Sequence, residues 1–172
     1  MRLDDNDFVL FGVPERFAQD RARLEERWKG LQREAHPDRF AAQGAAAQRV
    51  AMQWSVRINE AYRRLKDPLQ RAAYLCELRG APIQAEVNTA MPAEFLVQQM
   101  EWREALEEAR SEDELDALER QLSQARATAL AAIERHLDAE GDAVAAARQV
   151  RALMFVERFA HDVEARFAQL GQ

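Results

Sequence analysis

The sequence predicts an all-α protein with two domains. Apolar residues recur every three or four positions through most of the 172 residues, as they do in amphipathic helices. Only six glycines and five prolines occur, and most lie between these periodic segments, where helices are expected to end.

The net charge of −6 is divided unevenly along the chain. Residues 1–80 sum to +3 and residues 81–172 to −9, which favours two domains with different partners.

Four helices are expected in the amino-terminal domain, residues 1–80. The second and third, near 18–35 and 45–65, are the longest, and their apolar stripes should pack together as a hairpin. A short helix precedes them and ends at Gly12, and a fourth begins at Pro68. The large side chains that we expect in the core of the hairpin are Trp28, Leu31, Trp54 and Tyr62.

The chain reverses at His36-Pro37-Asp38, between the two long helices. Pro37 ends the preceding helix because it has no N–H and because its ring disfavours the α conformation at the residue before it. An imidazole and a carboxylate are therefore held at the tip of a helical hairpin. They could form an ordinary turn, an acid–base pair of an enzyme, or a contact for another protein. The enzymatic alternative lacks a nucleophile, since the only cysteine, Cys76, lies on the apolar face of the fourth helix.

Composition excludes several other classes of protein. One cysteine allows neither a disulfide framework nor a paired-cysteine zinc module. No run of 18 apolar residues occurs, and Met1–Asp5 does not resemble a signal peptide, so we expect a cytoplasmic protein without a membrane span. The positive charges in residues 1–80 are too few and too scattered to suggest nucleic-acid binding.

The carboxyl-terminal half should form an antiparallel three-helix bundle over 92–172, after a linker over 81–91. Pro92 opens its first helix, which runs to about Ala109. Ser111 then caps a second helix, with Glu114 three residues later as in a capping box. A third helix follows the break at Gly141-Asp142, and short connections between helices favour antiparallel neighbours.

The first bundle helix has apolar residues on two sides. At about 100° per residue, Phe95 and Trp102 share the side that should face the core, whereas Leu96, Val97 and Met100 lie on the opposite side. An apolar patch with no structural need is a candidate partner-binding site, although packing against the linker or the first domain would also explain it. Glutamates continue the same outer side, and Phe155 in the last helix, off the centre of its own stripe, could extend the patch. These glutamates are Glu101, Glu104 and Glu108.

The amino-terminal pattern resembles a J-domain, in which two helices flank an HPD loop and the helix before the loop is basic. The resemblance implies that this domain binds an ATPase chaperone and stimulates ATP hydrolysis without a catalytic group of its own. The residues that it assigns to chaperone binding are Arg27, Lys29, Arg33, His36, Pro37, Asp38 and Arg39.

The segment Phe95–Glu108 resembles the client-binding helix of the HscB family, the J-domain co-chaperones of iron–sulfur cluster assembly. Similar residues also occur at Leu10–Pro14, Ile58–Tyr62 and Arg71–Leu75. The resemblance implies an L-shaped protein that carries the cluster scaffold IscU to an HscA-type chaperone. Val97 stands where a longer methionine is common in the family, so the apolar patch should be smaller here. The implied scaffold contacts are Leu96, Val97, Met100, Glu101, Glu104, Glu108 and Phe155.

Two alternatives stay open at this point. The chain could be a J-domain adaptor for a different client, which would share the ATPase partner but not the scaffold. A hydrolase or metalloprotein could use His36, His136 and Cys76, although these residues show no motif for either role. We expect no catalytic residue, metal or cofactor. The four-cysteine zinc module of some eukaryotic relatives is absent from the sequence, which favours a bacterial-type protein.

Overall fold

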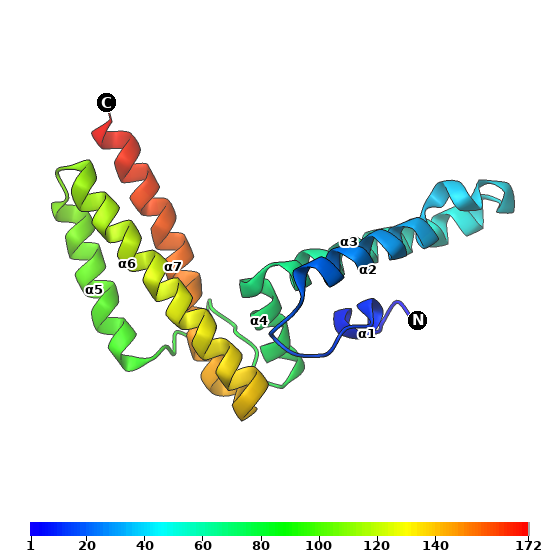
Figure 1. Cartoon of the computed structure of the whole chain (residues 1–172), viewed down its shortest axis with the longest axis horizontal. Coiled ribbons are helices and arrows are strands. Elements are labelled where there is room, and N and C mark those ends of the chain that lie inside the picture. The colour runs from blue at the N-terminus through cyan, green and yellow to red at the C-terminus, as the bar shows by residue number, and fades with distance from the viewer. Residues whose placement is uncertain (172) are drawn as a thin grey trace. The chain divides into compact units, whose positions relative to one another are not determined.

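A computed structural model describes residues 1–171 of the chain (Figure 1). All regular secondary structure in this range is helical, and the chain falls into two compact units, of which the first is Met1–Leu75 and the second begins at Cys76. The prediction of an all-α protein is therefore confirmed. The units divide inside helix α4 (Pro68–Leu78), whereas the sequence predicts domains over 1–80 and 92–172.

The first unit contains α1 (Asp7–Phe11), α2 (Arg21–Ala35) and α3 (Ala45–Lys66). Side chains cap the first two helices: Asn6 Oδ1 accepts the Val9 N–H, and Asp20 Oδ1 accepts the N–H groups of the first turn of α2. The helix after the turn begins at Ala45 as predicted, and α2 begins three residues later than predicted, where Asp20 caps it.

Helices α2 and α3 form the expected hairpin, with Leu24 and Leu31 buried on one helix and Ile58 on the other. Trp28 stacks on Tyr62 with ring centroids 4.7 Å apart. Of the four large side chains predicted in the core, Leu31 is buried, whereas Trp28, Trp54 and Tyr62 are only half-buried, so the prediction is wrong for the aromatic residues. Polar side chains also join the two helices. Gln32 Nε2 and Trp28 Nε1 both donate to Asn59 Oδ1, at 2.7 and 3.0 Å, and Ser55 Oγ donates to Gln32 Oε1.

A buried carboxylate attaches α1 to the hairpin. Asp7 is completely buried, and its two oxygens lie 2.8 Å from Arg57 Nη1 and 2.7 Å from Arg64 Nε. The hydrogen bond to Asp7 raises the pKa of Arg64, and the Tyr74 hydroxyl accepts the Asp7 N–H at 3.0 Å. Two cations thus compensate a charge that would be costly to bury alone, and the hydroxyl gives the Asp7 N–H a partner.

The turn between α2 and α3 is more regular than the sequence suggests. Residues Pro37–Gln43 form a 3₁₀ helix, η1, which ends at Gly44 with φ 100°. The sequence predicts no helix between the HPD residues and residue 45, so this short helix is an addition to the predicted fold. Pro37 suits the first position of a helical segment, since its missing N–H would have no partner there.

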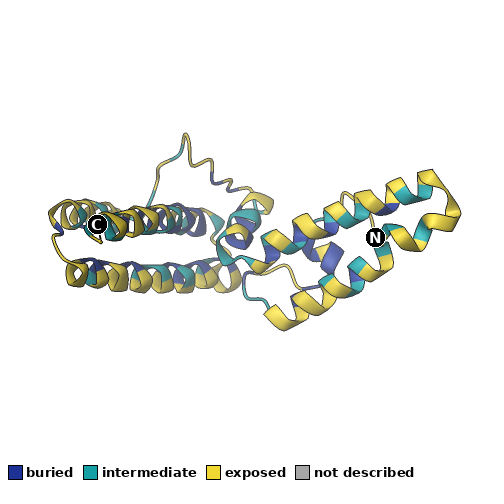
Figure 2. Ribbon diagram, turned by 90° about the horizontal axis from the view of Figure 1, so that it is seen from above, coloured by how far each residue is buried: buried dark blue, intermediate teal, exposed yellow. Residues whose placement is uncertain are grey.

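The second unit contains α5 (Ala93–Glu108), α6 (Glu112–Glu134) and α7 (Ala143–Leu170). Ser111 Oγ accepts the Glu114 N–H, and Glu114 Oε2 accepts the N–H of Arg110, so the predicted capping residues do begin α6. Figure 2 shows that buried residues lie on the facing sides of these helices and exposed residues on the outside. The three-helix bundle is therefore confirmed.

The carboxyl end of α6 departs from regular α-helix. Residues Arg135–Glu140 form a π-helical turn, η2, which ends at Gly141 with φ 66°. His136 Nδ1 lies 2.8 Å from Glu140 Oε2, and this hydrogen bond lowers the pKa of Glu140. Arg79 Nη1 donates to the Leu137 carbonyl at 2.6 Å, which gives one of the carbonyls of the distorted turn a partner.

Candidate functional site

The HPD loop, His36–Asp38, lies at the end of the α2–α3 hairpin because α2 ends at Ala35 and η1 begins at Pro37. His36 Nδ1 accepts the Asp38 N–H at 3.2 Å, so the imidazole stabilises the turn. The Asp38 carboxylate is 92% exposed, and its nearer oxygen lies 3.7 Å from His36 Nδ1. The loop therefore presents a carboxylate to solvent on a backbone that proline and histidine hold in place.

The basic residues near the loop differ in how free their side chains are. Arg27 Nε donates to the Phe11 carbonyl at 2.8 Å, and Arg39 Nη1 donates to the Arg33 carbonyl at 3.1 Å. Lys29 forms an ion pair with a glutamate one turn earlier at 3.1 Å. Arg27 and Arg39 thus have structural roles within the chain in addition to any contact with a partner. The sequence pattern did not distinguish these two arginines from the other basic residues.

Two of the residues that the hydrolase or metalloprotein alternative would use, Cys76 and His136, are buried or paired in the structure. The Cys76 thiol is buried, which raises its pKa to about 11, and it is therefore protonated at neutral pH. The His136 imidazole is paired with Glu140. In residues 1–171 no group of three His, Cys, Asp or Glu side chains is placed to hold a metal ion, and no helix in this range is long and apolar enough to cross a bilayer.

The outer side of α5 is exposed, as the helical spacing predicts. Leu96, Val97 and Met100 are 49%, 58% and 72% exposed. The glutamates that continue this side are also exposed, and none of them forms an ion pair within residues 1–171. We call this surface the α5 outer face, and it consists of Leu96, Val97, Met100, Glu101, Glu104 and Glu108.

Phe155 does not belong to the α5 outer face. It is only 7% exposed and packs between α5 and α7, with ring centroids 5.8 Å from Phe95, 6.4 Å from Trp102 and 5.6 Å from Phe159. The expectation that Phe155 lies off the core is therefore wrong. The reason is that α7 packs against both other helices, so its buried side is wider than a single stripe. The Arg103 guanidinium lies over the Phe155 ring, 5.3 Å from its centroid.

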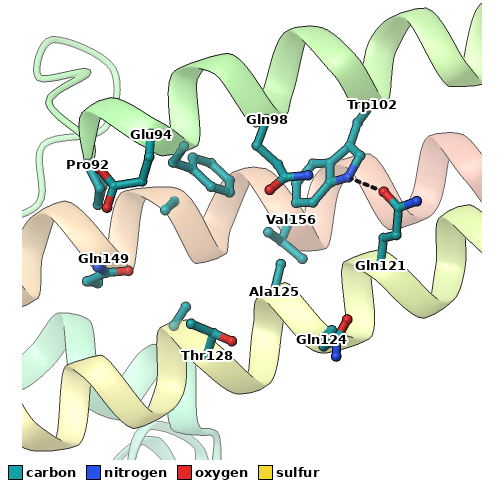
Figure 3. A pocket seen from close by; sticks show the side chains of 13 residues that line it. Pro92, Glu94, Gln98, Trp102, Gln121, Gln124, Ala125, Thr128, Gln149 and Val156 are labelled. Carbon is teal, nitrogen blue, oxygen red and sulfur yellow. Dashed lines mark hydrogen bonds between the residues drawn. The ribbon is translucent and has the colours of Figure 1, made fainter.

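A groove of about 500 Å³ lies on the inner side of α5, opposite the α5 outer face. Figure 3 shows Gln98 and Trp102 of α5 on one side of it and Gln121, Ala125 and Thr128 of α6 on the other. The Trp102 indole N–H donates to Gln121 Oε1 at 3.1 Å. Because alanine and threonine side chains are small, α5 is less closely packed here than the two helices below it.

Comparisons with known proteins decide the family. A family model described as the HSCB C-terminal oligomerisation domain matches residues 91–164. The co-chaperone protein HscB homolog of Cupriavidus taiwanensis is 53% identical over 164 residues, which cover 94% of this chain and 93% of the relative. The chain belongs to the HscB co-chaperone family. A second HscB homolog, from Burkholderia vietnamiensis, is 51% identical over 98% of this chain and 97% of its own length.

Solved HscB structures share the whole fold. Chaperone HscB from Vibrio cholerae matches with a TM-score of 0.79 and 36% identity, over 96% of this chain and 99% of that one. Human co-chaperone HscB matches with a TM-score of 0.87 and 25% identity, over 96% of this chain and 84% of that one. The fold is thus an HscB fold, with a J-domain followed by a three-helix bundle.

One residue near the candidate site escaped sequence reasoning. Arg151 is the only buried cation of α7, in the apolar stretch Val150-Arg151-Ala152-Leu153. Its position within that stretch was the available signal, because a charged residue that helical spacing directs toward the core needs a buried partner.

Proposed function

We propose that the protein is a co-chaperone that stimulates an HscA-type ATPase through its HPD loop and delivers the scaffold IscU through its bundle. One observation carries the proposal: an HscB-family chain exposes two unlike surfaces, one in each compact unit. The first is the polar HPD loop and the second the α5 outer face, both of which lack a role in their own unit's core.

The proposed role of the HPD loop follows from its exposed carboxylate. Asp38 would pair with an arginine of the ATP-bound chaperone, and His36 and Pro37 would keep the loop in the conformation that allows this pairing. Hydrolysis would be accelerated because the J-domain binds one conformation of the chaperone better than the others. The basic side of α2, above all Arg33, would steer the approach, with a smaller part for Lys29 because a glutamate offsets its charge. The effect should weaken with salt because the Debye length is about 8 Å at physiological ionic strength.

The proposed role of the α5 outer face is to supply affinity for the scaffold. Its three apolar side chains would gain about 1 kcal/mol each when a partner covers their exposed halves. The exposed glutamates beside them would favour a partner surface with a positively charged rim. The proposed partner is therefore a protein that offers apolar side chains next to lysine or arginine.

Both surfaces lie on one chain, and the proposed mechanism depends on that connection. When the bundle has bound the scaffold, the HPD loop reaches the chaperone together with the client. The connection raises the effective concentration of the client at the chaperone without any new contact. We place this activity in the bacterial cytoplasm, since the curated relatives are bacterial and the scaffold and chaperone would both be found there.

The experiment that tests the proposal is a titration of purified IscU into the full chain, followed by an ATPase assay with the HscA-type chaperone. Saturable binding and scaffold-dependent stimulation of hydrolysis would support both halves of the proposal. Stimulation of the ATPase without any scaffold binding would instead favour an adaptor for a different client. Absence of stimulation at any concentration would contradict the proposed role of the HPD loop.

A further inference from the structure

Two arginines of α7 hold the two ends of α5. At the amino end, Arg151 is 6% exposed and donates to three carbonyls of the segment before α5. Its Nε lies 3.0 Å from the Ile83 oxygen, its Nη1 3.1 Å from the Ala90 oxygen and its Nη2 3.4 Å from the Pro82 oxygen. Residues 81–91, which the sequence predicts to be a linker, are therefore attached to the bundle at two places.

At the carboxyl end, Arg166 Nη2 donates to the Ala109 carbonyl at 3.0 Å, and Ala109 directly follows α5. Arg151 and Arg166 are 15 positions apart on α7, which corresponds to about 22 Å of helix. The 16 residues of α5 span about 24 Å. The spacing of the two arginine positions along α7 is thus close to the length of α5.

Helix α5 packs less extensively on α6 and α7 than these two helices pack on each other. The groove of about 500 Å³ lies beneath the amino-terminal half of α5, with Ala125, Ala129 and Ala152 among its lining residues (Figure 3). Leu96 and Val97 of the α5 outer face belong to this same half of the helix. A helix seated over a groove needs fixed points at its ends if its outer side is to keep one orientation.

The chemistry at Arg151 is unusual for a residue that only fills space. No Asp or Glu in residues 1–171 forms an ion pair with it, and burial lowers its pKa. A buried guanidinium without a carboxylate is costly, so a site that required only volume would be better served by an apolar side chain. The guanidinium of Arg151 instead donates hydrogen bonds to carbonyls near both ends of the irregular segment 81–91 at the same time.

We propose that Arg151 and Arg166 are positioning residues for the client site: they bind carbonyls of the segment that leads into α5 and of the residue that follows it, and so fix the α5 outer face before the scaffold arrives. The affinity part of this inference rests on the proposed function, whereas the positioning part does not. A helix that is already in its bound position loses less conformational entropy on association. Loss of either contact should therefore weaken scaffold binding although neither arginine lies on the α5 outer face.

The test compares Arg151→Met with the matched control Arg148→Met in the full chain, since Arg148 is exposed one turn earlier on the same helix. Amide hydrogen exchange reports positioning directly and requires no partner. For Arg151→Met we expect exchange in the first two turns of α5 to become about tenfold faster, with α6 unchanged, and IscU affinity to fall about tenfold, as for a lost charge-assisted hydrogen bond. Arg148→Met should change neither quantity.

Arg151→Lys and Arg166→Met complete the test. Lysine keeps the charge but cannot bond three carbonyls at once, so its effects should be intermediate. Arg166→Met should speed exchange at the carboxyl end of α5, and it serves alone if Arg151→Met does not fold. Unchanged exchange in α5, or equally faster exchange in α5, α6 and α7, would overturn the inference. Faster exchange in α5 with no scaffold binding by the unaltered chain would uphold positioning and contradict the proposed function instead.

Discussion

The HPD loop and the α5 outer face are both exposed, but they are built in opposite ways. The loop is short and polar, and its shape is determined by Pro37, the His36–Asp38 hydrogen bond and the 3₁₀ helix that follows. The α5 outer face is apolar and acidic, and it belongs to one regular helix. A single exposed carboxylate offers little affinity, whereas apolar side chains offer little geometric selectivity. These properties suit the loop to its proposed role of selecting a partner's conformation and the helix to its proposed role of retaining a client.

Changing the loop should have the largest effect on ATP hydrolysis. We expect Asp38→Asn or His36→Gln to abolish stimulation of the chaperone ATPase, because the first removes the charge that would pair with an arginine and the second alters the hydrogen bond that shapes the turn. Scaffold affinity and melting temperature should not change. Steady-state ATPase assays and calorimetric titration check this, and a parallel loss of scaffold binding would mean that the two regions are not independent.

Changing the helix should have the largest effect on client binding. Replacing Leu96, Val97 and Met100 together by Ala should cost about 3 kcal/mol of binding free energy, or about 100-fold in Kd for the scaffold. Stimulation of the ATPase in the absence of scaffold should persist. The control is thermal unfolding. A melting temperature lowered by more than a few degrees would assign these side chains to a core and contradict their role as a binding surface.

The acidic row should contribute less, and mainly to association. Changing Glu101, Glu104 and Glu108 together to Gln should slow association with the scaffold by about three- to tenfold at low salt, with little effect above about 0.5 M salt, where charges are screened. Stopped-flow measurements over a salt series check this. An effect that is equally large at high salt would indicate direct, desolvated contacts rather than steering.

The smallest expected effect is a change of stability with pH that arises from Cys76, which lies outside both the HPD loop and the α5 outer face. Burial raises the pKa of Cys76 to about 11, and the thiol of an unfolded chain titrates near 8.5. The unfolded chain therefore loses this proton first, and the thiol's contribution to stability is present below pH 8.5 and is lost as the pH rises toward 11. Urea unfolding of the unaltered chain and Cys76→Ala at pH 7.5 and pH 10 checks this. The unaltered chain should lose more stability than the variant, and equal losses would contradict the assignment.

Much of the fold follows from local rules that the sequence displays. The positions of α2, α3 and α7 follow from apolar spacing, the end of α2 from Pro37, the break before α7 from Gly141, and the exposure of Met100 from its angle to Trp102. These features depend only on residues within a few positions of one another, so sequence spacing is enough to predict them.

The features that escaped prediction depend on contacts between elements distant in sequence. Phe155 is buried because Phe95 and Trp102 of α5 pack against its ring, which a wheel drawn for α7 alone does not show. Arg27 bonds the end of α1, and Arg151 bonds carbonyls more than 60 positions away. The tertiary structure therefore decides which basic side chains are free and which have a structural role. For this reason the sequence assigned Arg27 to partner binding alone.

The most direct test of the account measures how the scaffold changes the concentration of this chain that gives half-maximal ATPase stimulation. If the α5 outer face retains the client while the HPD loop acts on the chaperone, saturating IscU should lower that concentration about tenfold or more, because the client then binds the chaperone through the same complex. The Leu96, Val97 and Met100 to Ala variant should show no such shift. An equal shift in the unaltered chain and in this variant would contradict the account.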